Sequence, residues 1–260
     1  MPILFLLYAG IVLLYSNFAT TSPTPAGTSP KNRNEKKVIF LPTWGHEVLQ
    51  TEKYYSLSGN KDSLRFETIA FYVSNLAFLK NGNPVFIEKN SYHLINFGDT
   101  AAQQINLPHL SGSPDEISFD IGMDSLTNTS GAMGGDLDPT KGMYWTWQSG
   151  YIHIKIEGQS PLCPTRKNRF QFHLGGYKHP FPTLQHIRLP IKNNTTSIAE
   201  SSTAAAAAAD TTVIRIDLAE FMRNIDLQKQ NSLMIPGQDA KQLAYQFGQI
   251  FSIGYYVIDN

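Results

Sequence analysis

The stretch Met143–Glu157, which reads MYWTWQSGYIHIKIE, decides the fold class. Its last six residues alternate isoleucine with a polar residue, and 168–174 (NRFQFHL) repeats the pattern with Phe, Phe and Leu. A period of two places successive side chains on opposite faces of a β-strand, so each segment has one buried and one wetted face. Pro161 and Pro164 lie in the connection between them. The two segments are therefore predicted to form a β-hairpin.

Similar signals recur on both sides of this hairpin. Residues 64–79 are rich in β-branched and aromatic side chains, and Asn81-Gly82 is a strong hairpin turn signal. Half-buried strands must each cover one face, and two packed sheets achieve this. The sequence therefore predicts an all-β fold, an antiparallel two-sheet β-sandwich with two short helices near the C-terminus. Further strands are expected at 36–41, 85–87, 92–97, 116–121, 213–216 and 253–258, and the helices at 218–225 and from Pro236 onward.

The composition excludes several function classes. The 21 basic residues balance the 21 acidic ones, so the chain lacks the positive charge expected of a nucleic-acid binder. The sequence contains no Gly-rich phosphate loop, GxSxG or HExxH motif, and we expect that the protein is not an enzyme. The single cysteine, Cys163, cannot form an internal disulfide, so the fold must rest on its core. We expect this cysteine in a loop or turn.

The N-terminal region is typical of an exported protein. The run 3–15 (ILFLLYAGIVLLY) has the length of a signal-peptide core and is short for a transmembrane span. We predict a signal peptide at 1–19, with a retained membrane anchor as the alternative, and a flexible spacer at 20–35. One domain is expected over 36–260, with a low-complexity loop at 199–210. The predicted location is periplasmic or secreted, without stable membrane insertion after signal cleavage.

Two histidines of the predicted hairpin are candidate metal ligands. His153 and His173 fall on the polar face of their strands, and they lie opposite each other if the turn is centred near Cys163. Opposed side chains have Cβ atoms about 4.5–5.5 Å apart, close enough for two imidazoles to share a metal ion. A third ligand is expected from His46 or His93. The alternative is that the pair faces solvent, or that the long connection shifts the register.

Two tryptophans precede these histidines on the first strand. Trp145 and Trp147 share the parity of His153, so all three face the same side unless Gly150 forms a bulge. Tryptophans on a polar face indicate either functional exposure or a covering loop. The alternative is that they cap the end of the core.

A loop rich in oxygen-bearing side chains offers a different ion. Asp124, Asn128, Asp136 and Asp138 lie close together in sequence, beside flexible glycines. Hard oxygen ligands on a pliable loop suit Ca²⁺. The alternative is that these residues cap the local backbone, as Asp and Asn commonly do in turns.

The hairpin also resembles a known family. The stretch 142–158 (GMYWTWQSGYIHIKIEG) is similar to the signature of the MbnP-like copper-binding family, and 172–177 (FHLGGY) resembles its second landmark. The order and context of several shorter motifs agree, and the similarity covers roughly 38–260 without the alanine tract. These motifs are YVSNL at 72–76, YHLI at 92–95, FDIGMD at 119–124, DLDP at 136–139 and MIPG at 234–237.

The resemblance implies a periplasmic or secreted β-sandwich that binds copper. Family members use histidines together with an oxidised tryptophan, kynurenine, which a partner di-haem enzyme of the cytochrome c peroxidase type produces. Carried over to this sequence, His173 matches the second landmark, and Trp145 and Trp147 match the WxW motif. Members with a copper site tend to carry an Asn-His pair in the loop where this chain has Asn128-Thr129.

These observations lead to one preferred function and two alternatives. We expect a copper-binding or copper-handling protein of the cell envelope, with an oxidised tryptophan near the metal. The alternatives are a structural or adhesion-type β-sandwich that no longer binds metal, and a calcium-binding β domain.

Overall fold

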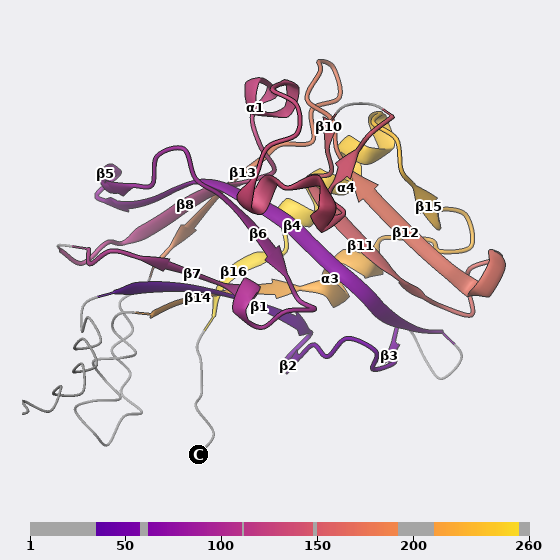
Figure 1. Cartoon of the computed structure of the whole chain (residues 1–260). Helices are drawn as coiled ribbons and strands as arrows, with labels where there is room; N and C mark the ends of the chain where they lie inside the picture. The colour runs from indigo at the N-terminus through magenta and orange to yellow at the C-terminus, as the bar shows by residue number, and fades with distance from the viewer. Residues whose placement is uncertain (1–34, 58–61, 111, 148–149, 192–210, 255–260) are drawn as a thin grey trace, which may run out of the picture. The chain divides into compact units, whose positions relative to one another are not determined.

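The computed structural model describes residues 35–57, 62–110, 112–147, 150–191 and 211–254 (Figure 1). The predicted signal peptide, nearly all of the predicted spacer and the low-complexity loop lie outside these residues. The described chain is mainly β-structure, as predicted, and its strands form two large sheets of nine and five strands with a separate two-stranded ribbon. Among the helices that the structure describes, none is both long and apolar enough to cross a membrane.

The strand β4 (Ser63–Lys80) is the spine of the nine-stranded sheet. Seven of its 18 residues are β-branched or aromatic, which favours a single long strand. One edge of β4 pairs with β6 (Tyr92–Asn96) and β5 (Asn83–Ile87), and the Asn81-Gly82 turn joins β4 to β5 as predicted. The other edge pairs with β8 (Glu116–Ile121) and β11 (Ile154–Gln159). In Figure 1, β4 crosses the sheet diagonally in purple.

Strands β8 and β11 lie end to end on the same edge of β4. The pairing of β8 stops where Ile121 faces Val73, and that of β11 starts where Ile154 faces Phe71. Between these two points, the Tyr72 N–H donates to the carbonyl of His153 over 3.0 Å, and the Tyr72 carbonyl accepts from the N–H of Gly122 over 2.9 Å. The two strands are therefore halves of one strand line. The chain leaves this line at Gly122 and returns at His153, and we call residues 122–153 the long excursion.

The next strand line is interrupted at the same level. Strand β12 (Arg169–Leu174) pairs with β11, and β13 (Gln185–Pro190) pairs with β8, both antiparallel. Residues 175–184, the short excursion, connect these two halves. Because the second interruption lies beside the first, where the His153 N–H donates to the carbonyl of Leu174, the two excursions leave the sheet next to each other.

The five-stranded sheet has the order β16-β14-β1-β2, with β7 also paired to β1. The purely antiparallel pairing expected from the sequence is wrong for two strand pairs. Strand β1 pairs parallel with β14, and β12 pairs parallel with the short β15. Alternation predicts which face of a strand is buried and does not specify the direction of its neighbour. The bounds in this region are β1 (Lys36–Trp44), β2 (Glu47–Val48), β7 (Gln104–Leu107), β14 (Thr211–Asp217), β15 (Ser232–Leu233) and β16 (Phe251–Gly254), with β3 (Tyr55–Ser56) pairing at the start of β4.

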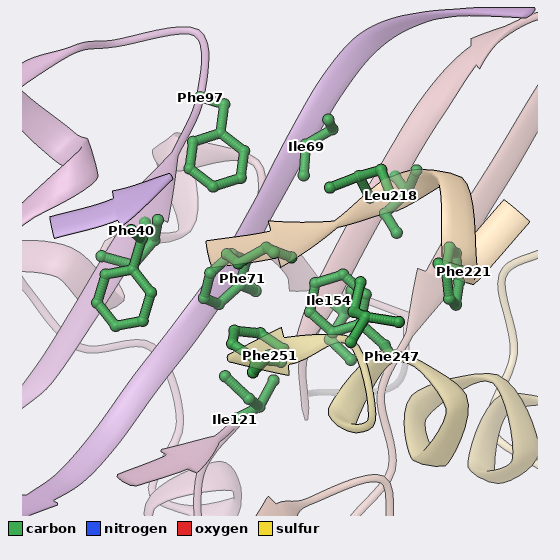
Figure 2. Close-up of a cluster of buried hydrophobic side chains, with 14 of the residues drawn as sticks. Phe40, Ile69, Phe71, Phe97, Ile121, Ile154, Leu218, Phe221, Phe247 and Phe251 are labelled. Atoms are coloured by element: carbon green, nitrogen blue, oxygen red, sulfur yellow. The ribbon is translucent and has the colours of Figure 1, made fainter. Parts of the chain in front are cut away.

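The main core lies between the two sheets and contains many phenylalanines (Figure 2). Phe40 from β1 meets Phe71 from β4 edge to face, with ring centroids 5.8 Å apart. The two predicted C-terminal helices, α3 (Leu218–Arg223) and α4 (Gln238–Gly248), add to this core. Phe247 of α4 lies 5.5 Å from Phe71. Burying one such side chain contributes about 1.5–3 kcal/mol, so the aromatic set is a main source of stability.

A second, smaller core lies on the opposite face of the nine-stranded sheet. The long excursion covers this face with a short helix, two 3₁₀ turns and the two-stranded ribbon. Tyr72 of β4 meets Tyr151 of the excursion at 5.9 Å, and Met143 and Trp145 are buried with them. The elements are α1 (Ser125–Thr129), η2 (Gly135–Leu137), η3 (Pro139–Lys141), β9 (Tyr144–Trp145) and β10 (Gly150–Tyr151), and the remaining 3₁₀ turns are η1 (Ala101–Gln103) and η4 (Arg166–Asn168).

Candidate metal centre

The register of the β11–β12 hairpin differs from the predicted one. His173 lies opposite Lys155, and Gln159 lies opposite Arg169, so the turn is centred one residue later than expected. Moving the centre by one residue moves every cross-strand partner by two. His153 precedes the paired stretch and donates its backbone N–H to the carbonyl of Leu174 over 2.8 Å. The prediction that His153 and His173 face each other is therefore wrong.

His153 is buried between the two excursions, with 0% of its surface exposed. Its Nε2 lies 2.7 Å from Nδ2 of Asn128 in the long excursion, and its Nδ1 lies 3.0 Å from the hydroxyl of Thr183 in the short excursion. Its ring also lies against Gly122, where an added Cβ would come within 2.5 Å of Nδ1. Gly122 has a φ of +103°, a conformation that side chains disfavour.

The neighbouring hydrogen bonds determine which nitrogen of His153 carries the proton. Asn128 accepts the Tyr151 N–H at its Oδ1 over 2.9 Å, so its Nδ2 must donate to Nε2 of His153. The Thr183 hydroxyl donates to the carbonyl of Gly176 over 3.2 Å, so its oxygen must accept from Nδ1 of His153. Both requirements are met by a neutral imidazole with its proton on Nδ1. Burial agrees with this state, because it lowers the pKa of His153 to about 4. Neither nitrogen has a free lone pair for a metal.

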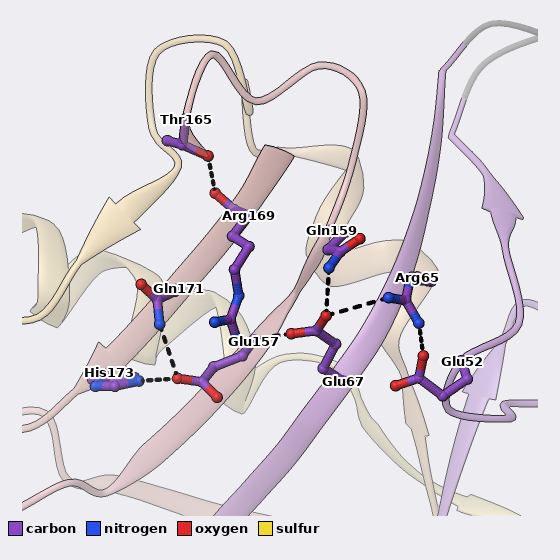
Figure 3. A network of polar contacts seen from close by, with 9 residues as sticks. All are labelled: Glu52, Arg65, Glu67, Glu157, Gln159, Thr165, Arg169, Gln171 and His173. Carbon is purple, nitrogen blue, oxygen red and sulfur yellow. Dashed lines mark hydrogen bonds and ion pairs between the residues drawn. The ribbon is translucent and has the colours of Figure 1, made fainter. Parts of the chain in front are cut away.

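His173 has a different environment on β12 (Figure 3). Its Nε2 lies 2.8 Å from Oε1 of Glu157 on β11, and both side chains are 13% exposed. The hydrogen bond from His173 is the largest cause that lowers the pKa of Glu157 to about 2, with Lys155 also contributing. Because Glu157 is a carboxylate at neutral pH, Nε2 of His173 must donate. With this proton on Nε2, Nδ1 is the ring nitrogen left to offer a lone pair.

A polar network continues along this face of the sheet (Figure 3). Gln171 donates to Glu157 over 3.2 Å. Further along, Glu67 accepts from Arg169 over 2.8 Å and from Gln159 over 2.7 Å. Arg65 bridges Glu67 and Glu52. Each of these carboxylates already has a protein donor, so the network holds the outer ends of β4, β11 and β12 together.

The two tryptophans of the long excursion lie in different environments. Trp145 is 7% exposed and packs on Gly175, where an added Cβ would lie 2.8 Å from the indole ring. Trp147 is 63% exposed, and its ring centroid lies 5.7 Å from that of Trp145. The shared face expected from parity does not apply, because β9 ends at Trp145 and Trp147 lies in the turn that follows. Gly175 is two residues beyond His173, which places Trp145 roughly 7 Å further along this chain segment.

The other two predicted histidines do not join His153 or His173. His46 is exposed in the turn between β1 and β2, in the five-stranded sheet. His93 lies on β6, beyond β4, and its Nε2 is 2.9 Å from Glu88. Within the described ranges, no three His, Cys, Asp or Glu side chains gather where they could hold a metal ion.

Each of the four oxygen-bearing residues of the calcium alternative has a hydrogen-bond partner within the protein. Asp124 caps α1 by accepting from Thr127, and Asp138 caps η3 by accepting from Thr140. Asn128 joins His153 to Tyr151, as described above. Asp136 accepts from the Leu94 N–H over 3.0 Å and from Lys141. Nothing in this part of the chain supports calcium binding.

Sequence reasoning missed the positions that hold the two excursions together. The sequence predicts Asn128 as an ion ligand or as a cap of the local backbone, and it assigns no role to Thr183 or Gly122. The sequence does contain one signal, since a glycine directly after a buried strand often marks a positive φ or a close approach. Gly122 has both.

The fold and the site together define a class of protein. It is a two-sheet β-protein in which a tryptophan-bearing excursion covers one sheet face, beside a histidine paired with a carboxylate. The family model MbnP matches residues 34–235, and the chain belongs to the MbnP family. Among solved structures, the fold is similar to that of MbnP from Methylosinus trichosporium, with a TM-score of 0.56 and 14% sequence identity over 77% of this chain and 83% of that one. No curated protein matches the chain.

Proposed function

We propose that this protein binds copper in the cell envelope and acts in copper handling. Its membership of the MbnP family supports a copper-related role. The observation that carries the proposal is the orientation of His173 by Glu157. Histidines that bind metals commonly donate their second ring N–H to a carboxylate, which fixes the tautomer and makes the other nitrogen a better ligand. His173 is held in this way, with Nδ1 as its ligand nitrogen.

Copper fits this donor better than calcium does. Imidazole nitrogen suits Cu²⁺ and Zn²⁺, and among the common divalent ions Cu²⁺ binds most tightly to such sites. One imidazole cannot hold copper alone. We propose that a modified tryptophan of the WxW motif supplies a further ligand when copper is bound.

Trp147 is the more accessible residue for such a modification. Its indole is 63% exposed, whereas Trp145 is 7% exposed. An oxidising partner of the di-haem cytochrome c peroxidase type would reach Trp147 without unfolding the excursion, and Trp145 would then connect it to the segment after His173. The same proposal places the protein in the periplasm or outside the cell after signal cleavage. It gives the protein no enzymatic activity of its own and no nucleic-acid partner.

Copper titration of single variants tests the proposal. The full chain is titrated with Cu(I) and Cu(II) against competing chelators, with and without co-expression of the di-haem partner. We expect His173→Ala to abolish tight binding and Glu157→Gln to weaken it roughly 10- to 100-fold, the range found for partners of ligating histidines. Co-expression should tighten binding in wild type, and Trp147→Phe should remove that gain.

The matched control is His186→Ala. His186 also pairs with a carboxylate, Asp120, but it lies on β13, and its side chain is 74% exposed. It should bind copper with wild-type affinity. Equal affinities of His173→Ala and wild type would refute the proposed site. No tight copper binding in any form would favour a structural or adhesion role.

A further inference from the structure

The two excursions pack together where Trp145 meets Gly175, and the side chain of His153 also joins them by hydrogen bonds. His153 contacts Asn128 of the long excursion through one ring nitrogen and Thr183 of the short excursion through the other. Asn128 passes the connection on to the N–H of Tyr151 in β10, and β10 pairs with the strand that contains Trp145. A continuous series of hydrogen bonds therefore runs from the tryptophan-bearing ribbon, through His153, to the carbonyl of Gly176.

Every hydrogen bond in this series points in the same direction. The Tyr151 N–H donates to Asn128, Asn128 donates to His153, His153 donates to Thr183, and Thr183 donates to Gly176. A proton added to Nε2 of His153 would face the amide –NH₂ of Asn128, donor against donor. Rotating that amide would relieve the conflict at His153 but would turn its –NH₂ toward the Tyr151 N–H. The series therefore admits only a neutral imidazole.

We propose that neutral His153 is a positioning residue that latches the tryptophan-bearing excursion to the sheet, and that protonation of its ring releases this latch. The inference goes beyond copper binding and holds whatever metal the protein carries. The latch is local, because the remaining contacts of the sheet, including the β4 ladder with β8 and β11, do not pass through the imidazole.

Among the residues that the structure describes, no charged group offsets the cost of protonating this ring. The side chains that face it are the Asn128 amide and the Thr183 hydroxyl, and Gly122 at the end of β8 contributes only backbone. The adjoining titratable groups of β4 and β10 are the phenols of Tyr72 and Tyr151, whose pKa values burial raises, so both are neutral. Burial is the cause that lowers the pKa of His153 to about 4 from an ordinary value of 6.5.

Hydrogen exchange as a function of pH tests the latch. Protection factors are measured in the full chain for the amides of 123–147 and 150–152 and, as a reference, for those of β4. Between pH 7.5 and 5, a shift from 6.5 to about 4 predicts a roughly 30-fold loss of protection in the excursion. The β4 amides should stay more protected at every pH. Constant protection of the excursion over this range, or equal protection of excursion and β4, would refute the latch.

Two variants and one control distinguish release of the latch by protonation of His153 from a general loosening of the protein by acid. His153→Gln removes the titratable group, so excursion protection should become independent of pH. Asn128→Asp is isosteric and keeps an acceptor for the Tyr151 N–H, but its second oxygen would accept a hydrogen bond from the Nε2–H of imidazolium. Acid should then no longer loosen the excursion, even if His153→Gln folds poorly. His186→Gln, at an exposed histidine, should retain the full wild-type response. A wild-type response in Asn128→Asp would overturn the proposal.

Discussion

Replacing Gly122 by alanine should destabilise the protein far more than replacing another glycine of similar backbone conformation. The new Cβ would lie 2.5 Å from Nδ1 and 2.7 Å from Cγ of His153, both closer than atoms can approach. His153 cannot move away without breaking its bonds to Asn128 and Thr183. The left-handed backbone adds about 1–2 kcal/mol, overpacking about 1–3 kcal/mol and each lost hydrogen bond about 0.5–1.5 kcal/mol. Together these contributions give an expected loss in free energy of unfolding of about 3–8 kcal/mol.

Gly82→Ala is the matched control for this prediction. Gly82 has a φ of +77°, but nothing lies within 4 Å of the position where a Cβ would be added. The Gly82→Ala variant should lose only the backbone contribution to the free energy of unfolding, about 1–2 kcal/mol. Urea unfolding of both variants, followed by far-ultraviolet circular dichroism, measures the two losses. Equal losses would show that Gly122 and His153 are not in contact and that β8 and β11 do not meet at Tyr72.

Two further predictions concern the candidate metal centre. The pKa of Glu157 is lowered to about 2 from 4.5, so its contribution to stability is complete above pH 4.5 and is lost as the pH falls toward 2. In urea unfolding at pH 5 and pH 3, Glu157→Gln should therefore show a smaller acid-dependent loss than wild type, and an unchanged loss would contradict the hydrogen bond with His173. In acrylamide quenching of tryptophan fluorescence, Trp147→Phe should remove most of the accessible emission, since Trp147 is 63% exposed and Trp145 only 7%. Trp145→Phe should leave that accessible fraction in place. Loss of the accessible emission in Trp145→Phe instead of Trp147→Phe would show that Trp145 is the exposed tryptophan.

The alternation of apolar and polar residues predicted much of the nine-stranded sheet. Ile154 and Ile156 are fully buried, as are Phe170 and Phe172 on the paired strand. Alternation also placed His173 on the outer face, where it meets Glu157. It could not predict the register, because the connection between β11 and β12 is long enough to centre on either of two neighbouring residues. Because the turn is centred one residue later than predicted, His173 lies opposite Lys155 and not opposite His153.

The positions of the excursions depend on contacts that no local pattern contains. Whether β8 and β11 share one strand line is decided by the backbone of Tyr72, about fifty residues before one and eighty before the other. The burial of His153 follows from this arrangement, since alternation alone would leave it on a wetted face. The parallel pairing of β1 with β14 is likewise set by packing between distant parts of the chain.

Copper content of the protein isolated from its native host is the most direct test of the proposed function. The protein is purified from the cell envelope fraction without added metal, and its metals are quantified by inductively coupled plasma mass spectrometry. The account predicts copper in stoichiometric amount with the protein, in excess of zinc and calcium. Protein that carries zinc, calcium or no metal in place of copper would contradict it.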